Sequence, residues 1–289
     1  MKNKKYLRVL VAIIIIFSAI TSFTGIFSNK GNGQYTITSI HGEEVTLYGK
    51  GIYKNDSISL VAQGIAQDWI VVILGIPMLI MAMILLRKES LKGKLLLTGT
   101  LGYFLYTYIS YTFLWNYNYL FLVYVLLMSS SLFAFILSIM EIDVAHLKSN
   151  FEDKLPTKLI GGFQIFLGIA LGMMWIGIIA QSLKTGAVPL GFIEHYTTLV
   201  IQGMDLGVVV PASILSGILL IKKNNYGYLM SSVLIIKGLS MLTTITAMQI
   251  NMMIAGVTVS LVTFTIFTLV NIGCIYLFMI LLRNIKSDT

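Results

Sequence analysis

The fold class is decided by residues 69–86, WIVVILGIPMLIMAMILL, which hold no charged side chain between Asp68 and Arg87. A helix of about 20 apolar residues crosses a hydrocarbon layer of about 30 Å, so this run predicts a membrane span, which we expect to begin near Ile58. The composition agrees: 57% of the 289 residues are apolar, only 11% are charged, and the mean hydropathy is +0.87. One aqueous core cannot cover that much apolar surface, which excludes a soluble enzyme, a disordered chain and a fibrous repeat.

Charge-free runs of the same kind lie on both sides of this span and predict eight transmembrane helices in all. Two runs are long enough for two helices each. We place the breaks at residues 115–118 (WNYN) and 249–251 (QIN), because polar residues favour turns. The predicted spans are 9–29, 58–86, two within 95–140, 159–183, 197–221, and two between 223 and 283. The predicted fold class is therefore all-α, a polytopic membrane helix bundle.

The basic residues are distributed unequally between the two sides of these helices. Of the 20 Lys and Arg, 15 lie on the side of the N-terminus, four lie on the other side, and Lys237 lies within a span. Loops on the cytoplasmic side of a membrane are enriched in Lys and Arg, so this bias predicts a multi-pass cell-membrane protein with both termini in the cytoplasm. The four on the other side are Lys30, Lys50, Lys54 and Lys184.

Residues 29–57 form the one sizeable segment that we expect outside the membrane. Residues 34–40 and 45–48 are rich in β-branched and aromatic side chains and flank a short polar turn, which predicts a small extracytoplasmic β-hairpin. Residues 54–57 (KNDS) supply N-cap chemistry for the helix that we expect to begin at Ile58. The basic start and apolar run of residues 1–29 leave a second interpretation open, a cleaved signal peptide, which would leave seven helices in unchanged orientation.

The two halves of the chain share a pattern. Residues 59–65 (SLVAQGI) align with 198–204 (TLVIQGM) at an offset of 139, and an acid, a proline and a basic pair follow in each half, with gaps between them. This predicts two parallel four-helix repeats, residues 1–158 and 159–289, related by a pseudo-twofold axis along the membrane normal. Because substrates and pores commonly lie between such repeats, the second and sixth helices are the candidates to line the interface.

Polar and charged residues inside the spans are the candidate ligand-binding residues, because burying them in lipid costs free energy. Lys237 lies about 15 Å from the cytoplasmic boundary by helix rise, so its ammonium needs protein, water or a counter-ion. Asp205 on the preceding helix is the nearest candidate partner. For Asp68 the alternative is hydration at a helix end. The candidate ligand-binding residues are Asp205, Lys237, Gln202, Gln63 and Asp68.

Two prolines and two glycines are the candidate flex points. Proline removes a backbone donor and frees a carbonyl, and glycines beside Asp205 would allow the helix to bend there. These residues are Pro77, Pro211, Gly203 and Gly207. In the first half, Tyr103 occupies the place of Lys237, so the two halves differ where charge matters.

Familiar catalytic signatures are missing from the sequence. It has no Walker motif, HExxH, nucleophile elbow or dinucleotide fingerprint, and Cys274 is the one cysteine, so we predict no cofactor and no metal site. Nucleic acid is not an expected partner, because the positive charge lies between apolar runs. The expected partners are the lipid bilayer, a small cationic or polar solute and, in one alternative, a membrane protein.

The leading hypothesis is an integral membrane protein that binds and transports a small solute or ion between its two halves. Two alternatives stay open. The first is a non-transporting sensor or accessory subunit, whose outer hairpin docks a protein or lipid partner. The second is a membrane-embedded lipid-modifying enzyme that uses Asp205, Glu194 and His195, although the missing signatures argue against an enzyme.

Overall fold

The computed structural model describes residues 4–286, and it is mostly helical. Seven helical segments in this range are long and apolar enough to cross a membrane, as in a multi-pass integral membrane protein. The first half holds α1 (Lys4–Phe27), β1 (Tyr35–Thr38), β2 (Glu44–Leu47), α2 (Ile58–Ile70), η1 (Val71–Gly75), α3 (Ile76–Arg87), α4 (Leu91–Phe113) and α5 (Phe121–Met140). The short helix η2 (Leu147–Asn150) lies in the connection to the second half. The second half holds α6 (Thr157–Thr185), α7 (Val200–Met204), η3 (Asp205–Val209), α8 (Val210–Ile221), α9 (Asn225–Ile254) and α10 (Leu261–Arg283).

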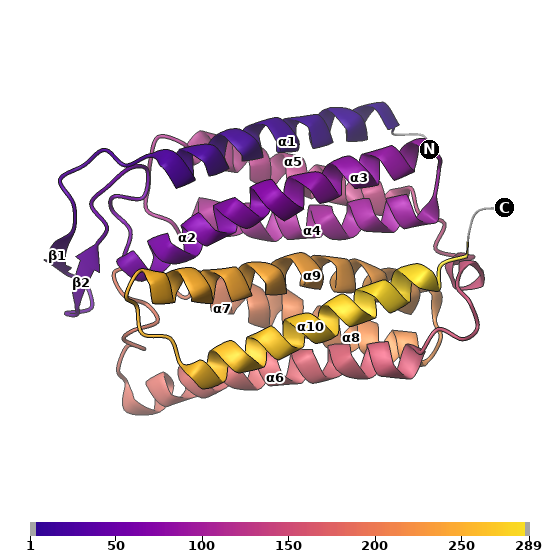
Figure 1. Cartoon of the computed structure of the whole chain (residues 1–289). Helices are drawn as coiled ribbons and strands as arrows, with labels where there is room; N and C mark the ends of the chain where they lie inside the picture. Colours follow the sequence, from indigo (N-terminus) through magenta and orange to yellow (C-terminus); the bar gives the residue numbers. More distant parts are fainter. Residues whose placement is uncertain (1–3, 287–289) are drawn as a thin grey trace.

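The helices run side by side along one bundle (Figure 1). The two strands lie at one end, here called the hairpin end. The start of α1 and the end of α10 lie at the opposite end, here called the terminal end (Figure 1). The seven apolar segments are α1, α2 to α3, α5, α6, α7 to α8, α9 and α10.

The helix α4 is long enough to cross but is not among these seven segments. Its 23 residues include several polar side chains that face other helices, among them Thr98, Thr100, Tyr103 and Thr107, all buried. Polar groups that lower its average hydropathy are therefore inside the protein. The arrangement with eight crossings stays a prediction.

The second and sixth predicted helices each contain a turn that is wider than an α-helical turn. In η1 the N–H of Ile76 bonds to the carbonyl of Val71, five residues back, and in η3 the N–H of Val210 bonds to the carbonyl of Asp205. A proline follows each wide turn at once, Pro77 in α3 and Pro211 in α8. Since proline has no N–H to donate, a regular i to i−4 ladder cannot pass through either point.

Several local features recur at one spacing of 134 residues. The spacing separates the wide turns (205 − 71 = 134) and the two prolines (211 − 77 = 134). It also separates Glu89 and Lys223, which have left-handed φ values of 57° and 54°. Gly93 and Gly227 follow the same rule, and a Cβ on either would clash with the end of the preceding helix, at Leu85 and Leu219 respectively.

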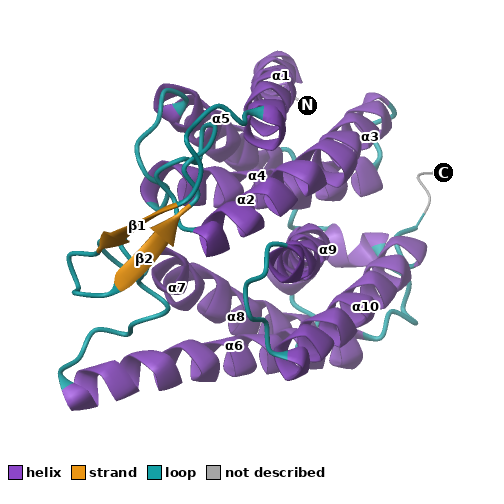
Figure 2. Ribbon diagram, turned by 60° about the vertical axis from the view of Figure 1, so that its left-hand side comes forward, coloured by secondary structure: helices purple, strands orange, loops and turns teal. Residues whose placement is uncertain are grey.

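The two halves meet through α9. It packs against α2 and α4 of the first half and against α8 and α10 of its own half, and Figure 2 shows it in the middle of the bundle. Gly99 of α4 permits this approach, since a Cβ there would clash with Ile236 of α9. The interface is therefore made by α2 and α4 on α9. The second predicted helix lines the interface through α2, as expected. The sixth contributes little to it, because α8 packs on α6 and α9, and its contact with α4 is made by α7 and Asp205.

The predicted break at residues 249–251 is wrong. The helix α9 continues to Ile254, and α10 begins only at Leu261. The polar side chains point at the other half of the protein: Asn251 donates its Nδ2 to the carbonyl of Ala62 in α2 at 2.7 Å, and Gln249 is buried. In this helix polar residues mark a contact and not a turn. The break predicted at residues 115–118 does lie between α4 and α5.

The predicted β-hairpin is present at the hairpin end. β1 and β2 are antiparallel, with Tyr35 opposite Leu47 and Thr38 opposite Glu44. The hairpin contacts the second half, because the Nε2 of His41 lies 2.9 Å from the carbonyl of Tyr196. Ser57 caps α2 as predicted, accepting from the N–H of Leu60.

Candidate functional site

Asp205 lies buried at the first position of η3, and both of its carboxylate oxygens accept hydrogen bonds. The hydroxyl of Tyr106 in α4 donates to Oδ1 at 2.8 Å, and the indole Nε1 of Trp175 in α6 donates to Oδ2 at 2.9 Å. Three helices from both halves thus meet at one carboxylate. The two hydrogen bonds satisfy both oxygens of the buried carboxyl group and fix its position between α4 and α6.

Lys237 in α9 joins the same cluster through an aromatic ring. Its Nζ lies over the ring of Tyr106, 4.2 Å from the centroid. Among the described residues no carboxylate lies within 4.0 Å of this ammonium, and Asp205 is the acid that acts on it electrostatically. A cation–π contact is worth about 0.5 to 2 kcal/mol, which offsets part of the cost of an ammonium inside a membrane.

Tyr106 therefore connects the two charges, with its ring toward Lys237 and its hydroxyl toward Asp205. We call Asp205, Tyr106, Trp175 and Lys237 the charged site. The structure brings the two predicted charges together here, although not in direct contact. Tyr106 and Trp175 were not predicted: Trp175 looks like an interfacial residue in the sequence, and Tyr106 is one of several aromatic residues on its helix.

The other predicted residues near Asp205 differ in their exposure. Gln202 lies buried in α7, one turn before the acid. Gly203 and Gly207 are exposed, and a Cβ on either would meet nothing within 4 Å. Their small size is therefore not needed for helix packing. Pro211, just after η3, is also exposed.

The structure does not bring Asp68 and Gln63 to the charged site. Asp68 is buried inside the first half, where the hydroxyls of Tyr53 and Tyr111 donate to it at 2.6 and 3.0 Å. Gln63 donates to the carbonyl of Ser59 on its own helix. Relative to the wide turns, Gln63 lies eight residues before Val71 (71 − 63 = 8), whereas Gln202 lies three before Asp205 (205 − 202 = 3). The two glutamines are thus at different heights.

Next to Asp68, at Gln67, a second set of hydrogen bonds connects the two halves. The Nε2 of Gln67 donates to the hydroxyl of Tyr103 at 2.6 Å, and that hydroxyl lies 3.1 Å from the Oγ1 of Thr244 in α9. Tyr103 is fully buried. The position that we predicted as the counterpart of Lys237 therefore carries an uncharged hydrogen bond across the same interface.

A cluster of loop residues at the hairpin end, here called the outer cluster, also joins the halves. Asp56 is buried, and its Oδ1 accepts from Asn116 and from the hydroxyl of Tyr196. Ser57 donates to Glu194, and the Nε2 of His195 lies 2.8 Å from the Nδ2 of Asn116. Among the buried atoms, Oδ2 of Asp56 and Nδ1 of His195 have no hydrogen-bond partner.

Burial shifts the acid–base behaviour of the outer cluster, because it penalises the charged forms. It raises the pKa of Asp56 to about 6, despite the hydrogen bonds from Asn116 and Tyr196 that favour the anion. It also raises the pKa of Glu194 above its usual range and lowers the pKa of His195. This end of the protein therefore changes its charge in the mildly acidic range.

The residues weighed for a lipid-modifying enzyme do not form one site. Asp205 is bonded to Tyr106 and Trp175 inside the bundle, whereas Glu194 and His195 lie in the loop before α7 and bond to Ser57 and Asn116. Within residues 4–286 no group of three or more His, Cys, Asp or Glu could hold a metal ion.

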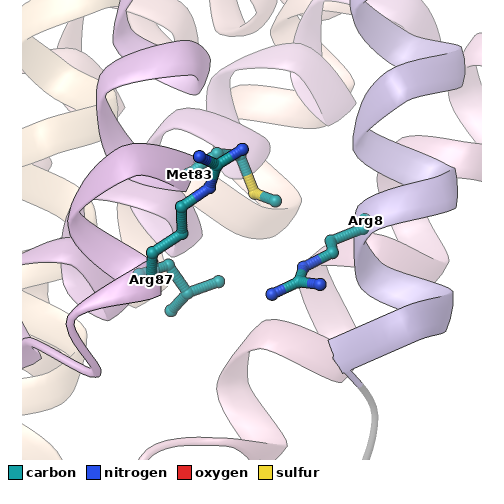
Figure 3. A pocket seen from close by; sticks show the side chains of 4 residues that line it. Arg8, Met83 and Arg87 are labelled. Atoms are coloured by element: carbon teal, nitrogen blue, oxygen red, sulfur yellow. The ribbon is translucent and has the colours of Figure 1, made fainter.

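Two cavities lie away from the charged site. One, of about 240 Å³, lies between α1 and α3 at the terminal end and is lined by Arg8, Met83, Leu86 and Arg87 (Figure 3). The other, of about 300 Å³, is a shallow depression on α10 lined by Leu261, Val262, Thr265 and Ile266.

No protein-family model matches the chain, and no curated protein and no solved structure shows significant similarity to it. The function is therefore argued from the geometry and chemistry of this chain alone.

Proposed function

We propose that this integral membrane protein binds a small polar or cationic solute or ion at the charged site and moves it across the membrane between its two halves. The observation that supports this most is the meeting of Asp205 and Lys237 through Tyr106 within membrane-spanning helices. Charged residues at such a depth are costly and are characteristic of ion or solute paths. Asp205 and the nearby Gln202 would engage the ligand, and Lys237 would act as the counter-charge.

The local construction of the helix supports a site that can rearrange. Asp205 begins the wide turn η3, and Pro211 follows it, so the backbone bonds are weakest where the acid is held. Helices α4 and α7 meet only at a few positions near Asp205, whereas α4 packs closely on α9. Breaking the Tyr106–Asp205 bond would therefore open this side of the interface without separating α4 from α9.

We further propose that the halves are related copies, in parallel orientation. The spacing of 134 residues relates the wide turns, the prolines and the left-handed residues of the helix ends. It also relates Gly99 to Val233 (233 − 99 = 134), and the backbone carbonyl of Val233 lies where a Cβ on Gly99 would meet it, at 3.0 Å. Contact between equivalent residues is what a twofold axis produces. The same spacing pairs Tyr103 with Lys237, so only the second copy carries the charge.

Within this proposal the chain crosses the cell membrane eight times, with α4 as the eighth crossing, and its terminal end faces the cytoplasm. The excess of Lys and Arg on that side supports the orientation.

The test is flux through the purified protein in proteoliposomes. Proton uptake is followed with an entrapped pH-sensitive dye, and uptake of monovalent and small organic cations with radiotracers. We expect Asp205→Asn and Lys237→Met each to reduce the flux at least tenfold. Lys184→Met removes the same charge from an exposed position and should leave the flux unchanged. Unchanged flux in both site variants would overturn the mechanism.

One observation favours the second candidate, a sensor or accessory subunit. Large side chains at the hairpin end are exposed, with Ile40 at 75%, Tyr117 at 78% and Tyr119 at 73%. Exposed aromatic and aliphatic residues on a polar face are typical of docking surfaces. A stable partner that co-purifies with the chain and is lost in a Tyr117→Ser variant, together with the absence of any flux, would favour this function.

A further inference from the structure

The cavity at the terminal end is lined in part by charged side chains that do not belong to the charged site. It has a volume of about 240 Å³, and two of its four lining side chains are arginines, Arg8 from α1 and Arg87 from the last turn of α3. Figure 3 shows both guanidinium groups reaching into the same space from facing helices. Met83 and Leu86 supply an apolar wall.

Among the described residues, no carboxylate pairs with either guanidinium. Within residues 4–286 no ion pair and no hydrogen bond joins Arg8 or Arg87 to another side chain. Two like charges that share a space repel one another, and an anion between them turns that repulsion into attraction. The cavity therefore has the charge of an anion site whose protein residues provide no anion.

The chemistry of arginine selects the kind of anion. A guanidinium presents its N–H groups as a planar fork that matches the oxygens of a phosphate or carboxylate in pairs. Two such forks on opposite walls suit a tetrahedral group with several oxygens better than a single carboxylate. At about 240 Å³ the cavity is large enough to admit a phosphoryl group.

We propose that Arg8 and Arg87 form a binding site for a phosphoryl anion, carried either by an anionic lipid headgroup or by a free phosphate. Both residues lie at the end of the bundle where α1 begins and α3 ends. Lipid headgroups reach helix ends at this depth, and the apolar wall of Met83 and Leu86 would face the glycerol and upper acyl atoms.

The second half does not repeat Arg87 at the 134-residue spacing. The residue 134 positions after Arg87 is Ile221 (87 + 134 = 221), which ends α8. The site therefore belongs to the α1–α3 pair and not to a feature common to both halves. It is also independent of the charged site, so it stands whether or not the protein transports a solute.

The experiment uses the purified full chain in a neutral detergent. Phosphatidylglycerol in mixed micelles is titrated and the apparent Kd is taken from the rise in heat stability, with phosphatidylcholine as the uncharged comparison. A second arm titrates inorganic phosphate. The variants are Arg8→Gln and Arg87→Gln, and the matched control is Lys88→Gln, which removes one positive charge from the next residue along the chain without touching the cavity.

We expect each arginine variant to weaken binding about five- to tenfold, as for the loss of one basic contact at a membrane surface, and Lys88→Gln to weaken it less than twofold. Arg87→Lys keeps the positive charge and loses the planar fork, so it should weaken binding less than Arg87→Gln and more than Lys88→Gln. A response to phosphatidylglycerol alone assigns the lipid headgroup, and a response to inorganic phosphate assigns the free anion. Equal weakening by Lys88→Gln and Arg87→Gln, or no saturable binding in either arm, would overturn the proposal.

Discussion

Tyr106 is the side chain through which the two intramembrane charges interact. Its ring faces the ammonium of Lys237 and its hydroxyl donates to Asp205, so one residue serves two charges of opposite sign. These two functions can be separated, because a phenylalanine keeps the ring and lacks the hydroxyl. At the scale of single residues, this makes Tyr106 the position where the charged site is most easily dissected.

We predict that Tyr106→Phe lowers the free energy of unfolding by about 1 kcal/mol, and that Tyr106→Leu lowers it further because the cation–π contact is lost as well. Equilibrium unfolding in mixed micelles measures both. The control is Tyr276→Phe, an exposed tyrosine on α10. If the hydrogen bond matters, the effects of Tyr106→Phe and Asp205→Asn will not add; strictly additive effects would contradict it.

The outer cluster leads to a prediction about pH. The pKa of Asp56 is about 6 in the folded protein because of burial, above its ordinary value of 3.8. Between these two values the folded state binds more protons than the unfolded state, so stability falls as the pH rises from about 4 to 6, by up to about 3 kcal/mol. Above pH 6 this loss is complete.

Heat stability of the detergent-solubilised protein, measured from pH 4 to 8, checks this prediction. Asp56→Asn should reduce the decline and leave the part that comes from Glu194, whose pKa burial also raises. Asp143→Asn, on an exposed loop, should leave the decline in place. His195 acts in the opposite direction, because its lowered pKa makes the folded state lose stability as the pH falls. A profile that stays the same in Asp56→Asn would show that the acid is not the titrating group.

At the scale of elements, the wide turns η1 and η3 interrupt the regular backbone hydrogen bonds of the second and sixth predicted helices. The sequence allowed a flexible point to be placed near Pro77 and Pro211, because a proline cannot donate to the ladder. It could not show that the proline follows a π-helical turn, or that Asp205 is the first residue of one. Both depend on which backbone carbonyl, several residues back, accepts each N–H, and the local sequence does not show this.

We predict that Pro211→Ala slows hydrogen exchange of the amides in residues 205–210 several-fold, because the new N–H can bond to the carbonyl of Gly207 and tighten the turn. Pro77→Ala is the matched change in the first half and should affect residues 71–77 only. Hydrogen exchange followed by mass spectrometry distinguishes these segments. Unchanged exchange around η3 would mean that the missing donor does not govern its opening.

The elements also show where sequence patterns succeed and fail. The hairpin and the cap at Ser57 depend on neighbouring residues, and the structure confirms both. The break at residues 249–251 depends on whether polar side chains meet water or another helix, which a local pattern does not contain. Asn251 meets the carbonyl of Ala62, 189 residues away, and the helix continues. For the same reason Tyr106 and Trp175 were not predicted as partners of Asp205.

At the scale of the whole molecule, the association of the two halves depends on α9. Its packing against α2 and α4 is close enough that a single glycine is required, since a Cβ on Gly99 would clash with Ile236. The sequence predicted two halves of four helices each, with the second and sixth helices at their interface. It did not identify α9 and α4, because hydrophobic faces in a membrane helix can meet either lipid or protein.

We predict that Gly99→Ala destabilises the protein by about 1 to 3 kcal/mol through overpacking between the halves. Gly162→Ala is the control, because a Cβ there meets nothing within 4 Å and removes only the helix cost of glycine. Unfolding in mixed micelles should therefore show opposite signs for the two variants. Equal stability of both would mean that α4 and α9 can move apart at no cost.

The wide turns η1 and η3 have a consequence for how this chain tolerates changes in length. A turn closed by a bond to the fifth residue holds one residue more than an α-helical turn needs. Removing an exposed residue of either turn, such as Ile73 or Val208, would take out this extra residue and leave the faces on both sides in the same rotational register, while Pro77 and Pro211 would still interrupt the ladder. Elsewhere in these helices the same deletion would rotate every later side chain by about 100°. A deletion of this kind should therefore disturb helix packing less at these two turns than elsewhere in the same helices.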